Sequence, residues 1–206
     1  KLEEDLFRGQ SPQVGWQRVF GGHVIGQALV AAQRTVSADR GVHSLHGYFM
    51  RPGDPSQPII YEVERIRDGS SFSTRWVVAI QHGKAIFSLQ ASFQTDEDGL
   101  EYQDEMPQVT APEDLPSPDE IRSTFLEGAP EHIIKYWRTE RPIEVRPIMM
   151  EHYFTNKSLP PVQHAWVRTL GPIPDDRVVQ ASVLAYLSDM LLLDTSLFFH
   201  GRSVFS

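Results

Sequence analysis

The sequence predicts an α+β fold of two units, each a long central helix wrapped by an antiparallel β-sheet, with the second unit incomplete in this chain. Three features of the 206 residues point to this fold. They are a helix-period segment rich in small residues, a series of period-two segments joined by tight turns, and a second run of strands and a helix. We expect the N-terminal unit at 1–104, an acidic, proline-rich linker at 105–140 and the front part of the C-terminal unit at 141–206.

The first helix is expected from Phe20 to Val36, in the stretch FGGHVIGQALVAAQRTV. Its glycines and alanines make it thin, so a sheet or another backbone can approach closely. Packing should then compensate for the helix propensity that the glycines lose. The apolar residues that recur at helical spacing on one side are Val24, Ile25, Ala28, Leu29, Ala32 and Val36.

Period-two segments after this helix predict a curved antiparallel meander, whose one apolar face must be covered. Tight turns at Asp68-Gly69 and His82-Gly83 separate them, and the first helix is the obvious cover. The third segment carries Phe72, Thr74, Trp76, Val78 and Ile80 on one face. The four segments are His43–Pro52, Ile59–Arg67, Ser71–Gln81 and Ala85–Gln94.

The pattern restarts after the linker. A short helix is expected near Asp119 to Leu126, capped by Ser117 or Asp119. Strands are expected over 143–154 and 163–171.

A second long helix is expected from Val178 to Leu193, after the start signal Pro174-Asp175-Asp176. A second copy of the first unit would still need a meander after this helix. We therefore expect one complete unit and the front part of another.

Composition narrows the class of protein. The net charge of −8 argues against binding to a nucleic-acid backbone, and no apolar run approaches the roughly 20 residues of a membrane span. The chain has no cysteine, which excludes disulfides and a cysteine nucleophile, and its histidines show no metal-ligand spacing. No G-x-S-x-G elbow is present, which disfavours an α/β-hydrolase. We expect a cytoplasmic protein, or a peroxisomal one if the source is a eukaryote, with no metal and no cofactor.

Several stretches together resemble the acyl-CoA thioesterase II family. They are DLFRGQSPQVGWQRVFGGHVIGQALVAAQRTV, VHSLHGYFMRPGDPSQPIIYEVERIRDGSSFSTRWVVAIQHGKAIFSLQASFQ, RPIEVRPI and PDDRVVQASVLAYLSDM. The resemblance implies a double hotdog fold and hydrolysis of acyl-CoA to a free fatty acid and coenzyme A without an acyl-enzyme intermediate. It also implies an aspartate on the second helix, matched by Asp189, with a threonine and a glutamine from strands that would lie beyond Ser206.

Asp189 stands in the apolar run VLAYLSDMLLLDTSL, beside the core-facing side of the second helix. A buried carboxylate there would need a partner or a task, and general-base catalysis is such a task. Spacing alone favours the alternative, an acid that points to solvent or pairs with an arginine, and the resemblance reverses that preference. For Asp194, near the predicted end of the helix, capping or solvation is expected.

Substrate contacts are expected from Gly21, Gly22, His23 and His46. The first three open the first helix, whose free N–H groups could meet an anion or a polarised thioester oxygen, although close packing explains the glycines equally well. His46 is the histidine to test as a base. His43 and His46 point to opposite faces of their strand, so they cannot share a metal.

The leading hypothesis is therefore an acyl-CoA thioesterase that acts by direct attack of water and assembles as a homo-oligomer, with no nucleic acid or membrane as partner. The alternative is a noncatalytic hotdog protein that binds acyl-CoA. A hotdog dehydratase is disfavoured, because the first helix lacks the histidine or acid pair that such enzymes use.

Overall fold

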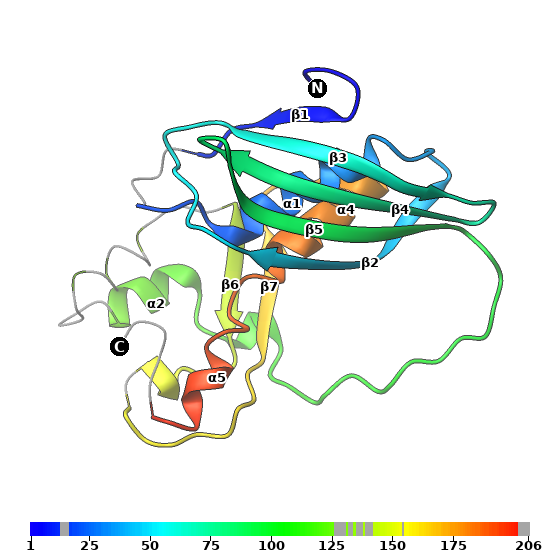
Figure 1. Cartoon of the computed structure of the whole chain (residues 1–206). Helices are drawn as coiled ribbons and strands as arrows, with labels where there is room; N and C mark the ends of the chain where they lie inside the picture. The colour runs from blue at the N-terminus through cyan, green and yellow to red at the C-terminus, as the bar shows by residue number, and fades with distance from the viewer. Residues whose placement is uncertain are drawn as a thin grey trace. The chain divides into compact units, whose positions relative to one another are not determined.

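The computed structural model describes residues 1–12, 17–125, 131, 134, 138, 142–153 and 155–201. The chain divides into two compact units (Figure 1). The first unit is Lys1–Leu100 with Pro174–Met190, and the second is Glu101–Ile173 with Leu191–Ser206. The second long helix thus folds with the N-terminal sheet.

The helix α1 (Gly21–Gln33) is the centre of the first unit, within the predicted range. Its small side chains bring it close to the sheet, and Ala28 and Ala32 are completely buried. Together with Leu29 they form one apolar cluster with Tyr61 and Phe87 of the sheet. Burial of this stripe supplies the packing that a helix with three glycines needs.

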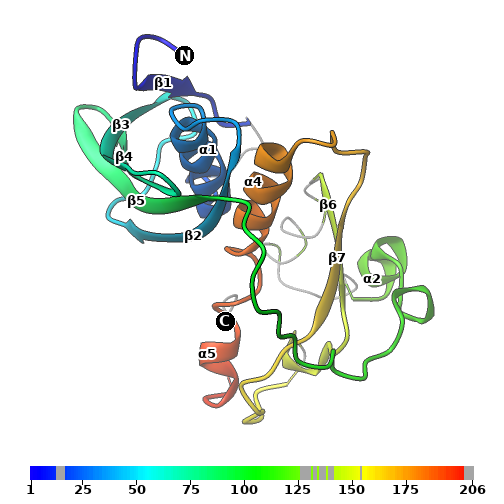
Figure 2. The same ribbon diagram turned by 90° about the vertical axis from the view of Figure 1, so that its right-hand side faces the viewer.

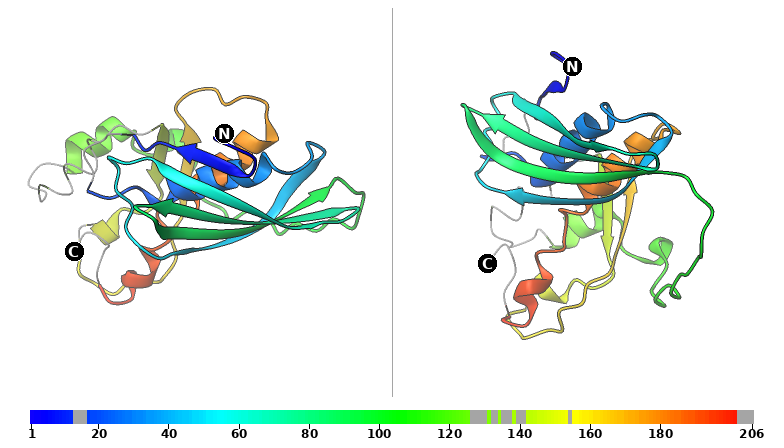
Figure 3. Two further views of the ribbon diagram at one scale, coloured as in Figure 1. Left: turned by 45° about the horizontal axis from the view of Figure 1, so that its top comes forward. Right: turned by 45° about the vertical axis from the view of Figure 1, so that its right-hand side comes forward.

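Five antiparallel strands cover α1 in the order β1-β3-β4-β5-β2 (Figures 1 and 3). The predicted meander is confirmed, and His82-Gly83 forms its tightest turn with both residues at positive φ. The short strand β1 was not predicted from the sequence. The bounds are β1 Leu6–Gly9, β2 Arg40–Phe49, β3 Ile59–Asp68, β4 Phe72–Gln81 and β5 Lys84–Thr95.

The buried face of β4 is not the one that carries its bulkiest side chains. Phe72 and Trp76 are 42% and 44% exposed, whereas Val77 and Ala79 are fully buried. The register explains this, because Val77 pairs with Leu89, which faces α1. Small residues suit this face since the backbone of α1 lies so close to it.

Arg75 also lies on the buried face of β4, with 1% of its surface exposed. Its guanidinium donates to the carbonyl and hydroxyl oxygens of Thr35, just past the end of α1, and to Asp68. A buried cation is tolerated when its donors are satisfied in this way. Arg75 therefore ties the end of α1 to the β3–β4 hairpin.

The second long helix, α4 (Arg177–Leu187), begins as predicted, with Asp176 accepting from the N–H groups of Val178 and Val179. It ends six residues before the predicted end at Leu193. Four residues after this end Leu191 adopts a positive φ, which a helix cannot include, and Leu192 and Leu193 are largely exposed. The run of apolar residues in the sequence thus continues beyond Leu187, although the residues after this point do not all pack into a core.

The helices α1 and α4 lie side by side, as predicted (Figure 3). A Cβ atom on Gly22 would lie 2.3 Å from the carbonyl oxygen of Tyr186, and one on Gly26 would lie 3.2 Å from that of Ser182. Glycine at these positions lets the two backbones touch. The cover of α4 by a sheet of its own stays a prediction.

The second unit contains the antiparallel pair β6 (Ile143–Pro147) and β7 (Ala165–Thr169) (Figure 2). The buried Glu144 on β6 pairs with Arg146 and Arg168. The strand expected over 143–154 is shorter, because β6 ends at Pro147 and Glu151–Tyr153 forms a 3-10 helix. The predicted ends of the short helix and of this strand, Leu126 and Phe154, lie outside the described residues. The remaining elements are α2 (Pro118–Phe125), α5 (Thr195–Phe198) and the 3-10 helices η1 (Pro112–Asp114) and η2 (Glu151–Tyr153).

The helix α2 confirms the predicted short helix and its cap. The hydroxyl of Ser117 accepts from the N–H of Glu120, and the carboxylate of Glu120 accepts from the N–H of Ser117. This reciprocal arrangement is a capping box.

Candidate functional site

Asp189 lies two residues past the end of α4, in a turn, rather than on the predicted helix. Its Oδ2 accepts a hydrogen bond of 2.8 Å from the N–H of Gly22. The first N–H groups of a helix have no partner within the helix, and Phe20 at the N-cap supplies none from its side chain. A carboxylate 167 residues away in sequence therefore caps α1 at the end where the helix dipole favours negative charge.

Gly21 makes room for this carboxylate. A Cβ atom on Gly21 would lie 2.6 Å from Oδ2 of Asp189 and 2.6 Å from the ring of Phe49. A Cβ atom does not approach a non-bonded carbon or oxygen atom that closely, so any side chain here would displace one or both groups. Glycine at position 21 thus leaves the space at the start of α1 that the carboxylate of Asp189 and the ring of Phe49 both adjoin.

The chemical state of Asp189 follows from these contacts. Although the residue as a whole remains exposed, α1 and Phe49 shield one side of its carboxylate. Partial burial raises the pKa of the carboxyl group, and the hydrogen bond from Gly22 opposes that rise without cancelling it. Within the described residues Oδ1 makes no hydrogen bond and no cation pairs with the carboxylate, so this oxygen can accept a proton from water.

A pocket of 410 Å³ opens beside Asp189, entirely within the first unit. Its interior is apolar, with the buried side chains of Val24, Ile86 and Phe87. The remaining lining residues are Arg18, Val19, Gly21, Phe49, Met50, Arg51, Pro52, Gly53 and Asp189. The site therefore combines a carboxylate, one of whose oxygens has no partner among the described residues, with an apolar surface and two cationic side chains.

The other predicted site residues lie apart from this pocket, except Gly21. The ring Nε2 of His23 lies 2.9 Å from the carbonyl oxygen of Gln10 and 2.9 Å from Nε2 of Gln27, so His23 holds the segment after β1. Gly22 meets the site only through its N–H. The substrate contacts assigned to Gly22 and His23 stay predictions.

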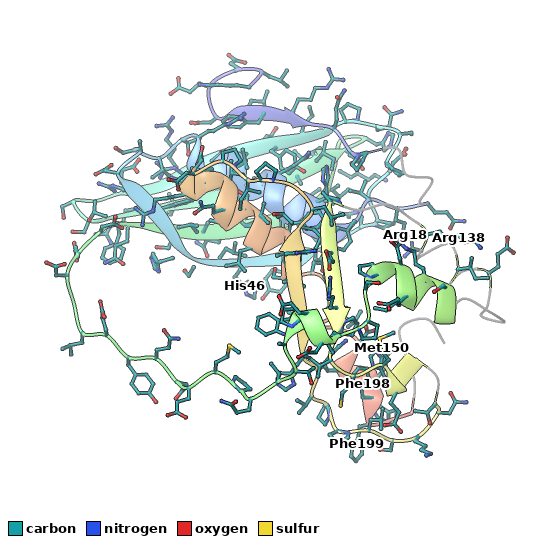
Figure 4. All side chains as sticks on the ribbon, turned by 180° about the vertical axis from the view of Figure 1, so that it is seen from behind. Arg18, His46, Arg138, Met150, Phe198 and Phe199 are labelled. Carbon is teal, nitrogen blue, oxygen red and sulfur yellow. The ribbon has the colours of Figure 1, made fainter. Side chains whose placement is uncertain are left out.

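His46 faces away from α1, in a shallow pocket with Trp76 and Gln90 on the outer face of the sheet. Figure 4 shows it well apart from Arg18. The structure does not bring His46 to Asp189, and its proposed contact with substrate also stays a prediction.

Capping or solvation is the expectation for Asp194, and its side chain is not solvated. It occupies the N-cap position of α5 and is only 5% exposed. Among the described residues no group of three metal-binding side chains converges, and none of the helices they form is long and apolar enough to span a membrane.

Sequence reasoning missed Arg18 and Phe49 as pocket residues, and it named Arg51 only as one of several arginines without assigning it to the site. Arg18 shortly precedes α1, and the other two lie at the end of β2. The ends of these elements meet only in the folded unit, and no local pattern signals that meeting. The available clue was that Arg18 lies close to the glycines that begin α1, where a ligand could approach the backbone.

Comparison with known proteins relates both the N-terminal and the C-terminal part of the chain to acyl-CoA thioesterases. Residues 8–94 match the family description "Acyl-CoA thioesterase N-terminal domain", and residues 135–206 match "Acyl-CoA thioesterase". Acyl-CoA thioesterase 2 of Haemophilus influenzae is 42% identical over 98% of this chain and 71% of its own length. Acyl-coenzyme A thioesterase 8 of Homo sapiens is 43% identical over 97% of this chain.

This chain spans 65% of the length of the human relative, so about a third of that protein has no counterpart in it. The crystal structure of an acyl-CoA thioesterase II from Mycobacterium marinum superposes with a TM-score of 0.74 and 39% identity. That superposition covers 97% of this chain and 67% of the other.

Proposed function

Since this chain belongs to the acyl-CoA thioesterase II family, we propose that the full-length protein hydrolyses fatty acyl-CoA to a free fatty acid and coenzyme A. The observation that carries this proposal for the chain itself is the position of Asp189. Its carboxylate lies at the N-terminus of α1 and on the wall of an apolar pocket, with one oxygen free of described partners. No metal and no cofactor are part of the proposal.

In the proposed reaction, Asp189 holds the attacking water through its Oδ1. The water oxygen bonds to the thioester carbonyl carbon while its proton passes to the carboxylate. The carbon–sulfur bond then breaks, and the departing coenzyme A thiolate takes up the proton from Asp189. A raised pKa suits this role, because a stronger base accepts the proton more readily and the acid returns it in the second step.

The glycines Gly21 and Gly22 serve mainly to position the carboxylate of Asp189, and contact with the substrate is secondary. The Gly22 N–H is already bonded to Oδ2, so it fixes the orientation of the base. Gly21 lines the pocket and is a backbone position that a substrate can approach. The threonine and glutamine implied by the family resemblance would complete the hold on the water.

Three further parts of the proposal rest on the sequence. The domain organisation is 1–104, a linker at 105–140 and 141–206. The protein assembles as a homo-oligomer, with no nucleic acid or membrane as partner. It acts in the cytoplasm, or in peroxisomes if the source is a eukaryote.

The test is release of coenzyme A thiol from medium- and long-chain acyl-CoA by the full-length protein, measured across pH with a chelator present. We expect hydrolysis that the chelator leaves unchanged. Because the base must be ionised, kcat/KM should fall as pH falls through the pKa of Asp189, and this acid limb should lie above the ordinary aspartate pKa of about 3.9. Binding of acyl-CoA without thiol release would contradict the proposal and favour the noncatalytic alternative.

A further inference from the structure

Two arginines line the pocket that holds Asp189, and they reach it from different elements. Arg18 precedes α1, and Arg51 follows β2. Both side chains are exposed, whereas Val24, Ile86 and Phe87 of the same pocket are buried. The cationic groups therefore lie at the rim of the pocket and the apolar surface lies inside it.

Main-chain hydrogen bonds set the position of both residues. The N–H of Val19 donates to the carbonyl oxygen of Gly53 at 2.9 Å, and the N–H of Arg51 donates to that of Ile86 at 3.1 Å. A Cβ atom on Gly53 would lie 3.0 Å from Val19, so the two rim segments are in close contact. The two arginines are thus brought to one rim by the fold.

Neither guanidinium is neutralised within the described part of the chain. Arg51 uses its Nη1 to donate to the carbonyl oxygen of Ala85 at 2.6 Å, which leaves its other N–H groups available. Arg18 makes no described hydrogen bond or ion pair. Among the described residues that line the pocket, Asp189 is the only acid, and its described bond is to Gly22.

The charge of the pocket lining is opposite in sign to the net charge of the protein. The chain carries a net charge of −8, yet the described lining of this pocket has two cationic side chains and one carboxylate. Guanidinium groups bind phosphate oxygens through several N–H donors at once. An apolar interior with a cationic rim suits a ligand that is apolar at one end and phosphorylated at the other.

We propose that Arg18 and Arg51 bind the phosphate groups of the coenzyme A part of the substrate and so set its orientation at Asp189. The inference rests on the proposed function, because it identifies the pocket beside Asp189 as the substrate site. It adds a specificity for phosphorylated thioesters that the carboxylate alone would not provide.

The experiment compares acyl-CoA with the matching acyl-pantetheine, which has the same thioester and no phosphate. In the full-length Arg18→Gln protein, KM for acyl-CoA should rise about tenfold, as expected for the loss of one charged hydrogen bond, while KM for acyl-pantetheine stays unchanged. The double variant with Arg51→Gln should show a larger rise. Added salt should raise the wild-type KM for acyl-CoA only.

Two variants serve as controls. Arg18→Lys keeps the charge and should recover part of the affinity. Arg34→Gln makes the same charge change at an exposed residue outside the pocket and should leave both KM values unchanged. Because Arg18 makes no hydrogen bond or ion pair with the described residues, its replacement removes none of those bonds, and the Arg18 result stands even if Arg51→Gln destabilises the protein.

The outcomes separate this inference from the proposed function. If the wild type hydrolyses neither thioester, the proposed function fails. If it hydrolyses both and the Arg18 and Arg51 variants alter neither KM, or alter both equally, the phosphate contact is wrong and the hydrolytic function stands.

Discussion

Asp189→Asn in the full-length protein is expected to lower kcat for acyl-CoA by about 100- to 10,000-fold, the usual range for loss of a general base, with little change in KM. Asparagine keeps the shape of the side chain and can still accept from the Gly22 N–H through its amide oxygen. It lacks the negative charge and cannot take a proton from water. Steady-state kinetics of thiol release measure both parameters.

The same variant should not lose stability at neutral pH. The pKa of Asp189 is raised in the folded protein, so ionisation costs folding free energy that is recovered only as pH falls below the raised pKa. Removing the charge removes that cost. The matched control is Asp98→Asn, an exposed aspartate outside the pocket, which should keep wild-type kcat. Wild-type turnover by Asp189→Asn, with Asp189→Ala merely unfolding, would make Asp189 structural.

Gly21→Ala should lower kcat by about 100-fold, the loss that a displacement near 1 Å can cause at an active site. The new Cβ atom would lie 2.6 Å from Oδ2 of Asp189 and 2.6 Å from the ring of Phe49. Both neighbours are ends of side chains, so they can move aside while the backbone stays in place. The carboxylate then leaves its position at the Gly22 N–H, and the bound water loses its orientation.

Gly26→Ala provides the control for this variant on the same helix. Its Cβ atom would meet the carbonyl oxygen of Ser182 at 3.2 Å and would not approach Asp189. The control should keep wild-type kcat, and thermal unfolding should confirm that both variants are folded. Equal loss of kcat in the two variants would indicate a general disturbance of α1 packing instead of a displaced base.

The parts of the fold that the sequence predicts are those with a local signal. Helical spacing between Val24 and Ala32 locates α1, and the pairs Asp68-Gly69 and His82-Gly83 locate the turns of the meander. The buried face of β4 could not be chosen in this way, since both of its faces carry apolar residues. Packing against a thin helix decides it, in favour of Val77 and Ala79.

The residues of the candidate site could be predicted from local sequence pattern much less well. Asp189 and Gly22 are 167 residues apart, and neither predicts the other by spacing. The role of Asp189 came from the family resemblance, and the structure adds the hydrogen bond, the shielding by Phe49 and the adjoining pocket. The end of α4 was misplaced because the apolar run continues to Leu193, although the helix ends at Leu187.

The central claim is that Asp189 activates water and does not itself attack the thioester. A single turnover in H₂¹⁸O, with full-length enzyme in excess over acyl-CoA, tests this most directly. Direct attack places one solvent oxygen in the fatty acid and none in the enzyme. Mass spectrometry of the released acid and of the peptide that contains Asp189 should therefore find ¹⁸O in the acid alone. Label in the Asp189 peptide, with unlabelled fatty acid, would reveal a covalent anhydride and contradict the account.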